Sequence, residues 1–266
     1  MAEASRTVLI NRAYWPLLDC QTRFIVLYGG AGSGKSVFAA QKALIRCMRD
    51  RGLRHLVVRK VAKTIRQSSF ALLCDLVAQW GIEDRWKVNH TEMTLRYLPL
   101  GSELISVGMD DREKLKSIYR AGAAWLEEPT ELAQEDLAQV NLRLRGDTPG
   151  YKQITLSFNP INEQHWLRKG LCEKPDPNVT VLQTTHRDNA FLDAQYRAEL
   201  EALADQNDQL YRVYALGEWG RLEGLVYAPP DTTSPWPERF DEEFYGLDFG
   251  FNNPMAMVWC GVRDAR

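Results

Sequence analysis

The chain has 266 residues, enough for one large domain or for a domain with part of a second. Its 45% hydrophobic content can fill a core, and 33 basic residues nearly balance 35 acidic ones, so the net charge of -2 carries no nucleic-acid signature. The five cysteines form no C-x-x-C pair and indicate neither a disulfide framework nor a zinc site. Without a signal peptide or an apolar run of about 20 residues, we expect a cytoplasmic protein with no membrane partner.

The first predicted strand leads into a glycine-rich loop. Apolar residues 24–28 precede the sequence GGAGSGKS at positions 29–36, and helical spacing of apolar residues follows over 35–49. This is the G-x-x-x-x-G-K-[ST] pattern of the phosphate-binding loop, or Walker A motif, which lies between a strand and a helix. Glycine allows the backbone to approach an anion closely, and amide N–H groups at a helix start bind phosphates.

The loop predicts that the chain binds a nucleoside triphosphate, ATP, together with Mg²⁺. Lys35 is expected to reach the β and γ phosphates, and the Ser36 hydroxyl to contact Mg²⁺. The predicted binding residues are Gly29, Gly30, Ala31, Gly32, Ser33, Gly34, Lys35 and Ser36.

Strand and helix signals alternate after the loop. The order is a strand at 55–59, a helix at 64–80, a hairpin at 94–98 and 103–107, a strand at 123–126, a helix at 131–144, strands at 153–158 and 179–183, and helices at 194–204 and 209–216. This alternation predicts an α/β fold, a P-loop NTPase with a mainly parallel central sheet flanked by helices.

The C-terminal part differs in composition and in hydrophobic pattern. Residues 228–237 are rich in proline and have no periodic pattern, as is typical of a linker. Two strands, 244–248 and 255–262, follow, and a lone hairpin is marginal in water. We therefore expect an ATPase domain at 1–227, a linker at 228–241, and at 242–266 a truncated β-hairpin that begins a second domain.

Two glutamates end the strand at 123–126. The carboxyl edge of an open α/β sheet is where ligands bind, and a phosphate loop needs an acidic partner for its metal. Glu127 is the predicted Mg²⁺ ligand, and Glu128, on the other side of the strand by the two-residue period, is predicted to polarise the attacking water. The alternative is a solvated surface pair. The doublet favours hydrolysis over phosphoryl transfer to a small metabolite.

Together these motifs resemble the large subunit of tailed-bacteriophage terminase, the ATPase and nuclease that packages and cuts viral DNA. The resemblance covers nearly the whole chain in the family's order: PLL at 16–18, YGGAGSGKS at 28–36, VVRK at 57–60, IRQSSF at 65–70, KLKS at 114–117, WLEEPTE at 125–131, LRLR at 142–145, SFNP at 157–160, THRDNAFL at 185–192, LGEW at 216–219, GLVY at 224–227 and GLDFG at 246–250.

The resemblance implies further catalytic residues. Asn159 matches a coupling motif that senses the γ-phosphate, although it could also simply start a turn before Pro160. Arg143 or Arg145 could be the arginine that neutralises transition-state charge, in cis or from a neighbouring subunit; the alternative is the surface of a helix end.

Other basic and acidic residues are further candidates. Arg59 and Arg66 are weaker candidates for the same arginine or for holding adenosine. A basic cluster could face DNA or be merely solvated: Lys114, Lys116 and Arg120. Asp248 matches the first metal-binding carboxylate of a ribonuclease-H-like nuclease.

The sequence departs from the family pattern at two points. Many relatives have a basic residue in the loop where this chain has Ala31. The later acidic strands that a two-metal nuclease needs are absent before Arg266, so nuclease activity of this polypeptide is not expected.

The leading hypothesis is an ATP-hydrolysing motor that moves double-stranded DNA into a procapsid. Its implied partners are the terminase small subunit, the portal protein and further copies of the chain in a ring, with a monomer possible in isolation. The alternatives are another nucleic-acid-dependent P-loop ATPase, such as a helicase-like enzyme, and a nucleotide-binding docking module without turnover.

Overall fold

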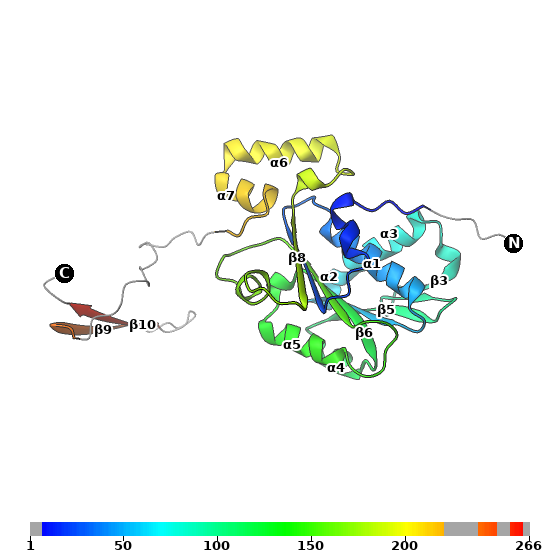
Figure 1. Cartoon of the computed structure of the whole chain (residues 1–266), viewed down its shortest axis with the longest axis horizontal. Coiled ribbons are helices and arrows are strands. Elements are labelled where there is room, and N and C mark those ends of the chain that lie inside the picture. Colours follow the sequence, from blue (N-terminus) through cyan, green and yellow to red (C-terminus); the bar gives the residue numbers. More distant parts are fainter. Residues whose placement is uncertain (1–6, 221–238, 249–255, 263–266) are drawn as a thin grey trace. The chain divides into compact units, whose positions relative to one another are not determined.

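The computed structural model describes residues 7–220, 239–248 and 256–262. The chain divides into two compact units, residues 1–222 and 223–266, which are considered separately (Figure 1). Among the described residues, no helix is long and apolar enough to cross a membrane.

The first unit is built on an eight-stranded sheet with the order β3-β4-β5-β2-β6-β7-β1-β8. Six strands are parallel: β1 (Phe24–Gly29), β2 (Arg54–Arg59), β5 (Ser102–Gly108), β6 (Ala121–Glu127), β7 (Gln153–Phe158) and β8 (Val179–Thr184). The antiparallel strands β3 (Trp86–Asn89) and β4 (Thr94–Tyr97) extend one edge. The predicted α/β class and mainly parallel sheet are confirmed. Strand β3 was not predicted from the sequence.

The helices of the first unit are α1 (Lys35–Arg49), α2 (Ala62–Gln67), α3 (Ser69–Gln79), α4 (Arg112–Ser117), α5 (Gln134–Arg143), α6 (Ala194–Gln206) and α7 (Asp208–Leu210). Short 3-10 turns occur at Arg12–Leu17, Glu83–Arg85, Pro129–Glu131 and His186–Asp188, and single π-type turns at Arg168–Cys172 and Tyr211–Ala215. The predicted helix at 64–80 is two helices, because the backbone at Ser68 leaves the helical region. The helix expected from residue 131 starts at Gln134, after the turn that begins with Pro129.

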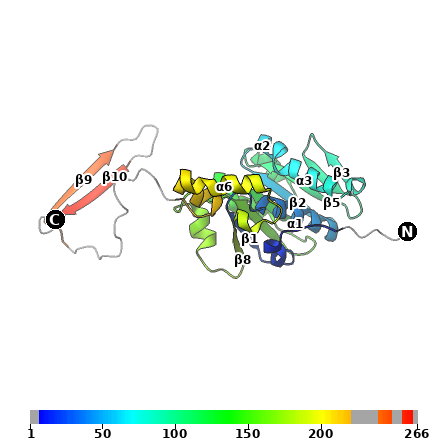
Figure 2. The same ribbon diagram turned by 90° about the horizontal axis from the view of Figure 1, so that it is seen from above.

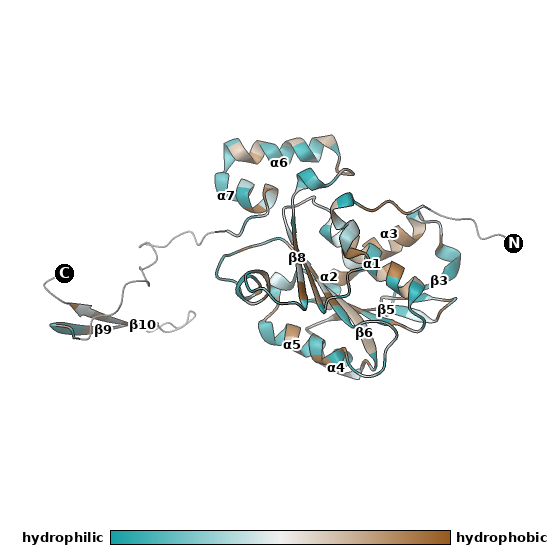
Figure 3. Cartoon of the chain, viewed as in Figure 1, coloured by the Kyte–Doolittle hydropathy of each residue, from teal (hydrophilic) through white to brown (hydrophobic). Residues whose placement is uncertain are grey.

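Side chains alternate across the sheet and fill two cores. Trp125 packs with Phe38 and Leu44 of α1 on one face, whereas Leu126 packs with Leu137 and other residues of α5 on the opposite face. Figure 1 shows α1 and α3 on one side of the sheet and α4 and α5 on the other. The hydrophobic residues, brown in Figure 3, gather on the strands and on the inward faces of these helices. The inner strands are thus buried on both faces, as strands of parallel sheets usually are.

The described residues of the second unit form an antiparallel hairpin of β9 (Glu242–Asp248) and β10 (Ala256–Val262), visible in Figure 2. Its apolar side chains remain largely exposed, among them Phe244, Leu247, Met257 and Val258. The predicted linker lies mostly outside the described residues. The hairpin agrees with the two strands expected from the sequence.

Candidate nucleotide-binding site

The glycine-rich loop connects β1 to α1 at the carboxyl edge of the sheet. Gly29, Gly32 and Gly34 have φ of 145°, 69° and 89°, which side-chain-bearing residues rarely adopt. A Cβ on Gly29 would lie 1.8 Å from the Thr184 carbonyl oxygen at the end of β8. These positions therefore require glycine, and α1 begins directly after the loop, at Lys35. Its first amide N–H groups are free to bind an anion.

Lys35 lies under the loop and is almost fully buried. Its Nζ donates to the carbonyl oxygens of Gly29 (3.0 Å) and Gly30 (2.7 Å), to Ser33 Oγ (3.0 Å) and to Asn159 Oδ1 (2.9 Å). Burial lowers the pKa of Lys35 to about 8, and the Glu128 carboxylate partly opposes this. The structure thus places Lys35 and Asn159, 124 residues apart in sequence, in direct contact. The parallel pairing explains this, because β7 lies beside β1.

Glu127 is the last residue of β6 and is 8% exposed. Its Oε2 makes no hydrogen bond to any described residue, and Arg59 Nε lies 4.0 Å away. Burial raises the pKa of Glu127, while the Arg59 guanidinium and the hydroxyls of Ser69, Ser68 and Ser36 lower it. A buried carboxylate oxygen without a partner, close to a serine hydroxyl, fits a hard cation such as Mg²⁺, which is often bound by one carboxylate and substrate phosphates. The described residues contain no group of three or more His, Cys, Asp or Glu side chains placed to hold a metal ion.

Glu128 follows β6 and takes a left-handed conformation, with φ 51° and ψ 52°. Its N–H donates to Ser157 O (2.9 Å). Two-residue alternation predicted that Glu128 lies on the other side of the strand. The strand in fact ends at Glu127, and the turn sets the direction of Glu128. Burial raises the pKa of Glu128, Lys35 lowers it and Glu127 raises it further. Such strained backbone clusters at functional sites.

A pocket of about 410 Å³ brings most of the predicted site residues together. It is lined by Ala31, Gly32, Ser33, Gly34, Lys35, Ser36, Val37, Glu128, Asn159, Asn189 and Leu192. An adjoining cavity of about 210 Å³ shares Gly34, Val37 and Asn189 with it. The second cavity also contacts Asn11, whose Nδ2 is buried without a hydrogen bond to the described residues, and Gln41 of α1. Asn11 and Gln41 belong to no motif of the sequence, and Asn189 lies in the THRDNAFL string without a predicted role of its own.

Arg143 and Arg145 lie away from this pocket. Helix α5 runs from the carboxyl edge of β6 back to the amino edge of the sheet, where Arg23, just before β1, donates to Asn141 Oδ1 and Leu144 O. Together with Arg120, the two arginines line a separate cavity of about 360 Å³. The β6 strand of seven residues separates the two edges by roughly 20 Å.

The other predicted basic residues differ in position. Arg59, at the end of β2, lies beside Glu127 and donates to Ser68 Oγ (2.9 Å). Arg66 instead donates to the carbonyl oxygen of His90, in the turn between β3 and β4. The backbone of Lys114 belongs to α4, and Asp248 ends β9 in the second unit; the Lys116 and Asp248 side chains lie outside the described part of the chain.

Comparison with known proteins identifies the family. A sequence profile described as "Phage terminase large subunit" matches residues 21–218. The terminase large subunit of Bacillus phage SPP1 is 33% identical over 249 residues, which is 88% of this chain and 59% of the relative. The PBSX phage terminase large subunit of Bacillus subtilis (strain 168) is 26% identical, over 87% of this chain and 59% of the relative. The chain therefore spans about 59% of the length of these curated relatives.

Solved structures show the same fold. The large terminase of a thermophilic bacteriophage, solved in complex with ADP, matches with a TM-score of 0.68 and 18% identity, over 96% of this chain and 66% of that one. The HK97 bacteriophage large terminase matches with a TM-score of 0.61 and 13% identity, over 78% and 48%. With most of its length matched by the family profile and by these relatives, the chain belongs to the phage terminase large subunit family.

Proposed function

We propose that this chain is the ATP-hydrolysing motor portion of a terminase, which moves double-stranded DNA into a procapsid. One observation carries the proposal: the loop amides, Lys35, Ser36, Glu128 and Asn159 meet in a single pocket, and Glu127 lies next to Ser36. The large terminase of the thermophilic bacteriophage has been solved in complex with ADP and with ATP-gamma-S, which supports ATP as the ligand of this chain.

The two adjoining cavities suit the two ends of ATP. The triphosphate fits the larger one, where the loop amides and Lys35 provide donors. Adenosine fits the smaller one, between Phe38, Asn11 and Gln41. Gln41 Nε2 donates to Leu9 O (2.9 Å), which leaves its amide oxygen for the adenine amino group, while Asn11 Nδ2 is a donor for a ring nitrogen.

The residues of this chain divide the work of hydrolysis. Ser36 and Glu127 would hold Mg²⁺, which when bound neutralises phosphate charge. Glu128 lines the pocket, and its raised pKa suits a base that orients water and accepts its proton. Lys35 would leave Asn159 for the phosphates when ATP binds, so that Asn159 is released and can report on the γ-phosphate.

The arginines suggest why an assembled ring would matter. Arg59, beside Glu127, is the internal cation that could compensate for Ala31 in the loop. Arg143 and Arg145 cannot reach the pocket of their own subunit, so an arginine-finger role for them, or for Arg120 in the same cavity, requires a neighbouring subunit. This favours a homo-oligomeric ring on duplex DNA, with the portal protein and the small subunit as further partners.

The second unit is proposed to start the nuclease domain. Asp248, at the end of β9, would be its first metal-binding carboxylate. Two metals need several carboxylates, so this polypeptide is proposed not to cut DNA by itself.

ATP hydrolysis should be measured for the chain alone, with duplex DNA, and with the cognate portal and small subunit. A packaging motor hydrolyses slowly alone and faster when assembled on duplex DNA. Stimulation and strand separation on single-stranded substrates would instead support a helicase-like ATPase. Nucleotide binding without turnover in any assembly would support a docking module.

A further inference from the structure

The segment that follows β8, residues 185–216, contacts the phosphate loop. The carbonyl oxygen of its residue Tyr214 accepts a hydrogen bond from the Ala31 N–H (2.7 Å), and Asn189 Nδ2 donates to the Gly32 carbonyl oxygen (2.7 Å). A Cβ on Gly32 would lie 3.0 Å from the Tyr196 ring and 3.1 Å from Leu192. The loop therefore contacts this segment directly at two consecutive residues.

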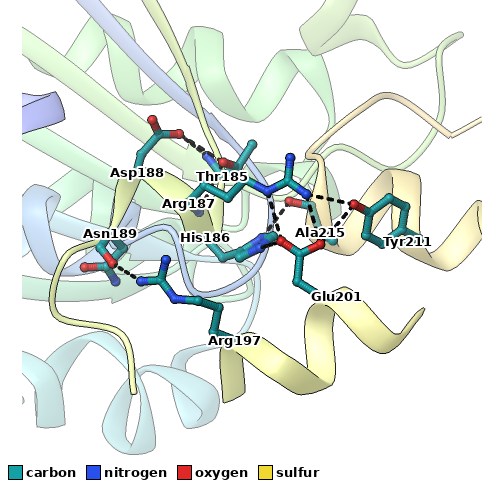
Figure 4. A network of polar contacts seen from close by, with 9 residues as sticks. All are labelled: Thr185, His186, Arg187, Asp188, Asn189, Arg197, Glu201, Tyr211 and Ala215. Carbon is teal, nitrogen blue, oxygen red and sulfur yellow. Dashed lines mark hydrogen bonds and ion pairs between the residues drawn. The ribbon is translucent and has the colours of Figure 1, made fainter. Parts of the chain in front are cut away.

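The Asn189 side chain has a defined orientation. Its Oδ1 accepts from the Phe191 N–H (3.0 Å), so the amide nitrogen must be the end that faces Gly32. Its backbone N–H donates to His186 O (3.2 Å). Its backbone carbonyl accepts from Arg197 of α6 (2.9 Å), as Figure 4 shows. Both the side-chain amide and the backbone of Asn189 are thus held by hydrogen bonds before any nucleotide binds.

A network of polar contacts holds the turn that precedes Asn189 in place (Figure 4). Glu201 of α6 accepts from His186 Nε2 (2.8 Å), from Arg187 through two bonds of 2.9 Å, and from the Tyr211 hydroxyl (3.1 Å). His186 Nδ1 also contacts the Ala215 carbonyl oxygen (3.2 Å). Arg187, and after it His186, lowers the pKa of Glu201 to about 2, which keeps this carboxylate ionised. The network joins the turn that bears Asn189 to α6 and to the Tyr211–Ala215 turn.

The bond to Gly32 has a consequence for the loop donors. In a trans peptide the carbonyl and the following N–H point in opposite directions, so fixing the Gly32 oxygen toward Asn189 directs the Ser33 N–H away from Asn189. Tyr14 acts in the same way on the next peptide, because its hydroxyl donates to Ser33 O (3.0 Å). Two successive amide donors are thereby oriented from outside the loop.

We propose that Asn189 is a positioning residue for nucleotide binding: it holds the Gly32 peptide so that the loop amides already face the phosphate site. The inference rests on the proposed function, because ATP must be the ligand of the loop. Because the N–H donors are already oriented, less conformational entropy is lost when the nucleotide binds.

The test measures the affinity of the chain for AMP-PNP with Mg²⁺ by isothermal titration, together with KM and kcat for ATP. Asn189→Ala should raise Kd and KM by about tenfold, the effect of one lost hydrogen bond with some added loop freedom, while kcat stays within about twofold. Asn189→Asp has the same shape, but an ionised carboxylate cannot donate to Gly32 O. It should lose at least as much affinity as Asn189→Ala.

A matched control lies in the same segment. Asn207 Oδ1 accepts from the Leu210 N–H (3.0 Å) and does not line either nucleotide cavity. Asn207→Ala removes this cap and should leave Kd and KM unchanged. Thermal unfolding of each variant without nucleotide shows whether it is folded.

Three results would overturn the inference: unchanged Kd and KM in Asn189→Ala, restored affinity in Asn189→Asp, which indicates a space-filling role, or an equal loss in Asn207→Ala. Failure of the unaltered chain to bind AMP-PNP would instead contradict the proposed function itself.

Discussion

Lys35 shows how far a motif predicts a site. The loop pattern identified the lysine, and its burial under the loop follows from the strand before it and the helix after it. The pattern could not show that Lys35 contacts Asn159, because that bond depends on β7 lying beside β1. Nor could it identify Asn189, which reaches the loop from 157 residues away. Local sequence gives the chemistry of a site, whereas strand order decides which distant side chains complete it.

The first prediction concerns Lys35, which lines the larger of the two nucleotide cavities. Lys35→Ala should abolish detectable ATP hydrolysis and weaken nucleotide binding by about 10- to 100-fold, because a charged donor to the phosphates is lost. Titration with a non-hydrolysable analogue and a phosphate-release assay measure the two effects. Unchanged affinity and turnover would refute the assignment of the loop.

The second prediction follows from the lowered pKa of Lys35. Its pKa is about 8 in the folded chain, against the ordinary lysine value of 10.5 in the unfolded chain, so between these values the unfolded chain binds more protons. Without nucleotide, this lysine makes folding stability rise with pH across that window. Bound phosphates favour the ammonium form, so AMP-PNP binding near pH 9 should take up protons.

Calorimetry in buffers of different ionisation enthalpy measures this uptake. Lys35→Met provides the control and should remove the uptake. Proton uptake of the same size in Lys35→Met, or none in the unaltered chain, would show that Lys35 is not the titrating group.

At the scale of elements, buried runs and helical spacing located most strands and helices, whereas interruptions and short pieces were missed. The break at Ser68 occurs where its hydroxyl accepts from Arg59 of β2, a contact between elements that helical periodicity cannot reveal. Helix α4 has only six residues, too few for a periodic pattern. The direction of α5 could not be predicted from the sequence either, and it matters most for function. It carries Arg143 to the edge of the sheet opposite the nucleotide pocket.

The third prediction follows from that course. Arg120→Ala, Arg143→Ala and Arg145→Ala, made separately, should leave nucleotide affinity of the isolated chain unchanged. At least one should lower turnover in the assembled, DNA-packaging state, where an arginine finger contributes about 10³- to 10⁵-fold.

Mixing subunits tests whether the arginine acts across an interface. Assemblies that mix the inactive arginine variant with Lys35→Ala should regain activity. At some interfaces the Lys35→Ala subunit supplies the arginine, and the arginine variant supplies an intact phosphate loop. Full activity of all three arginine variants would direct attention to Arg59, beside Glu127.

At the scale of the whole molecule, the sequence predicted the fold class and the family, and the comparisons confirm both. The boundaries of the ATPase domain and linker remain predictions; the structure separates residues 1–222 from 223–266, five residues before the expected boundary at 227. The predicted linker rests on its proline-rich composition and on the lack of a periodic pattern.

The fourth prediction concerns the second unit. The 266-residue polypeptide should not nick supercoiled plasmid in Mg²⁺ or Mn²⁺, because Asp248 is the one carboxylate of the hairpin that matches the nuclease site, and two metals need further carboxylates. A version extended with the acidic strands of a relative should cut, and Asp248→Ala in that version should not. Cleavage by the 266-residue chain that disappears in Asp248→Ala would contradict the proposed division of activities.

The most direct test of ATP hydrolysis at this pocket is single-turnover ATP hydrolysis by Glu128→Gln and Glu127→Gln. Glu128→Gln keeps the shape but removes the base, so ATP should bind normally while hydrolysis falls by about 10²- to 10⁴-fold. Glu127→Gln should instead weaken Mg²⁺-dependent binding. Exchanged phenotypes would reverse the roles of the two glutamates, and normal hydrolysis by both variants would contradict the proposed site.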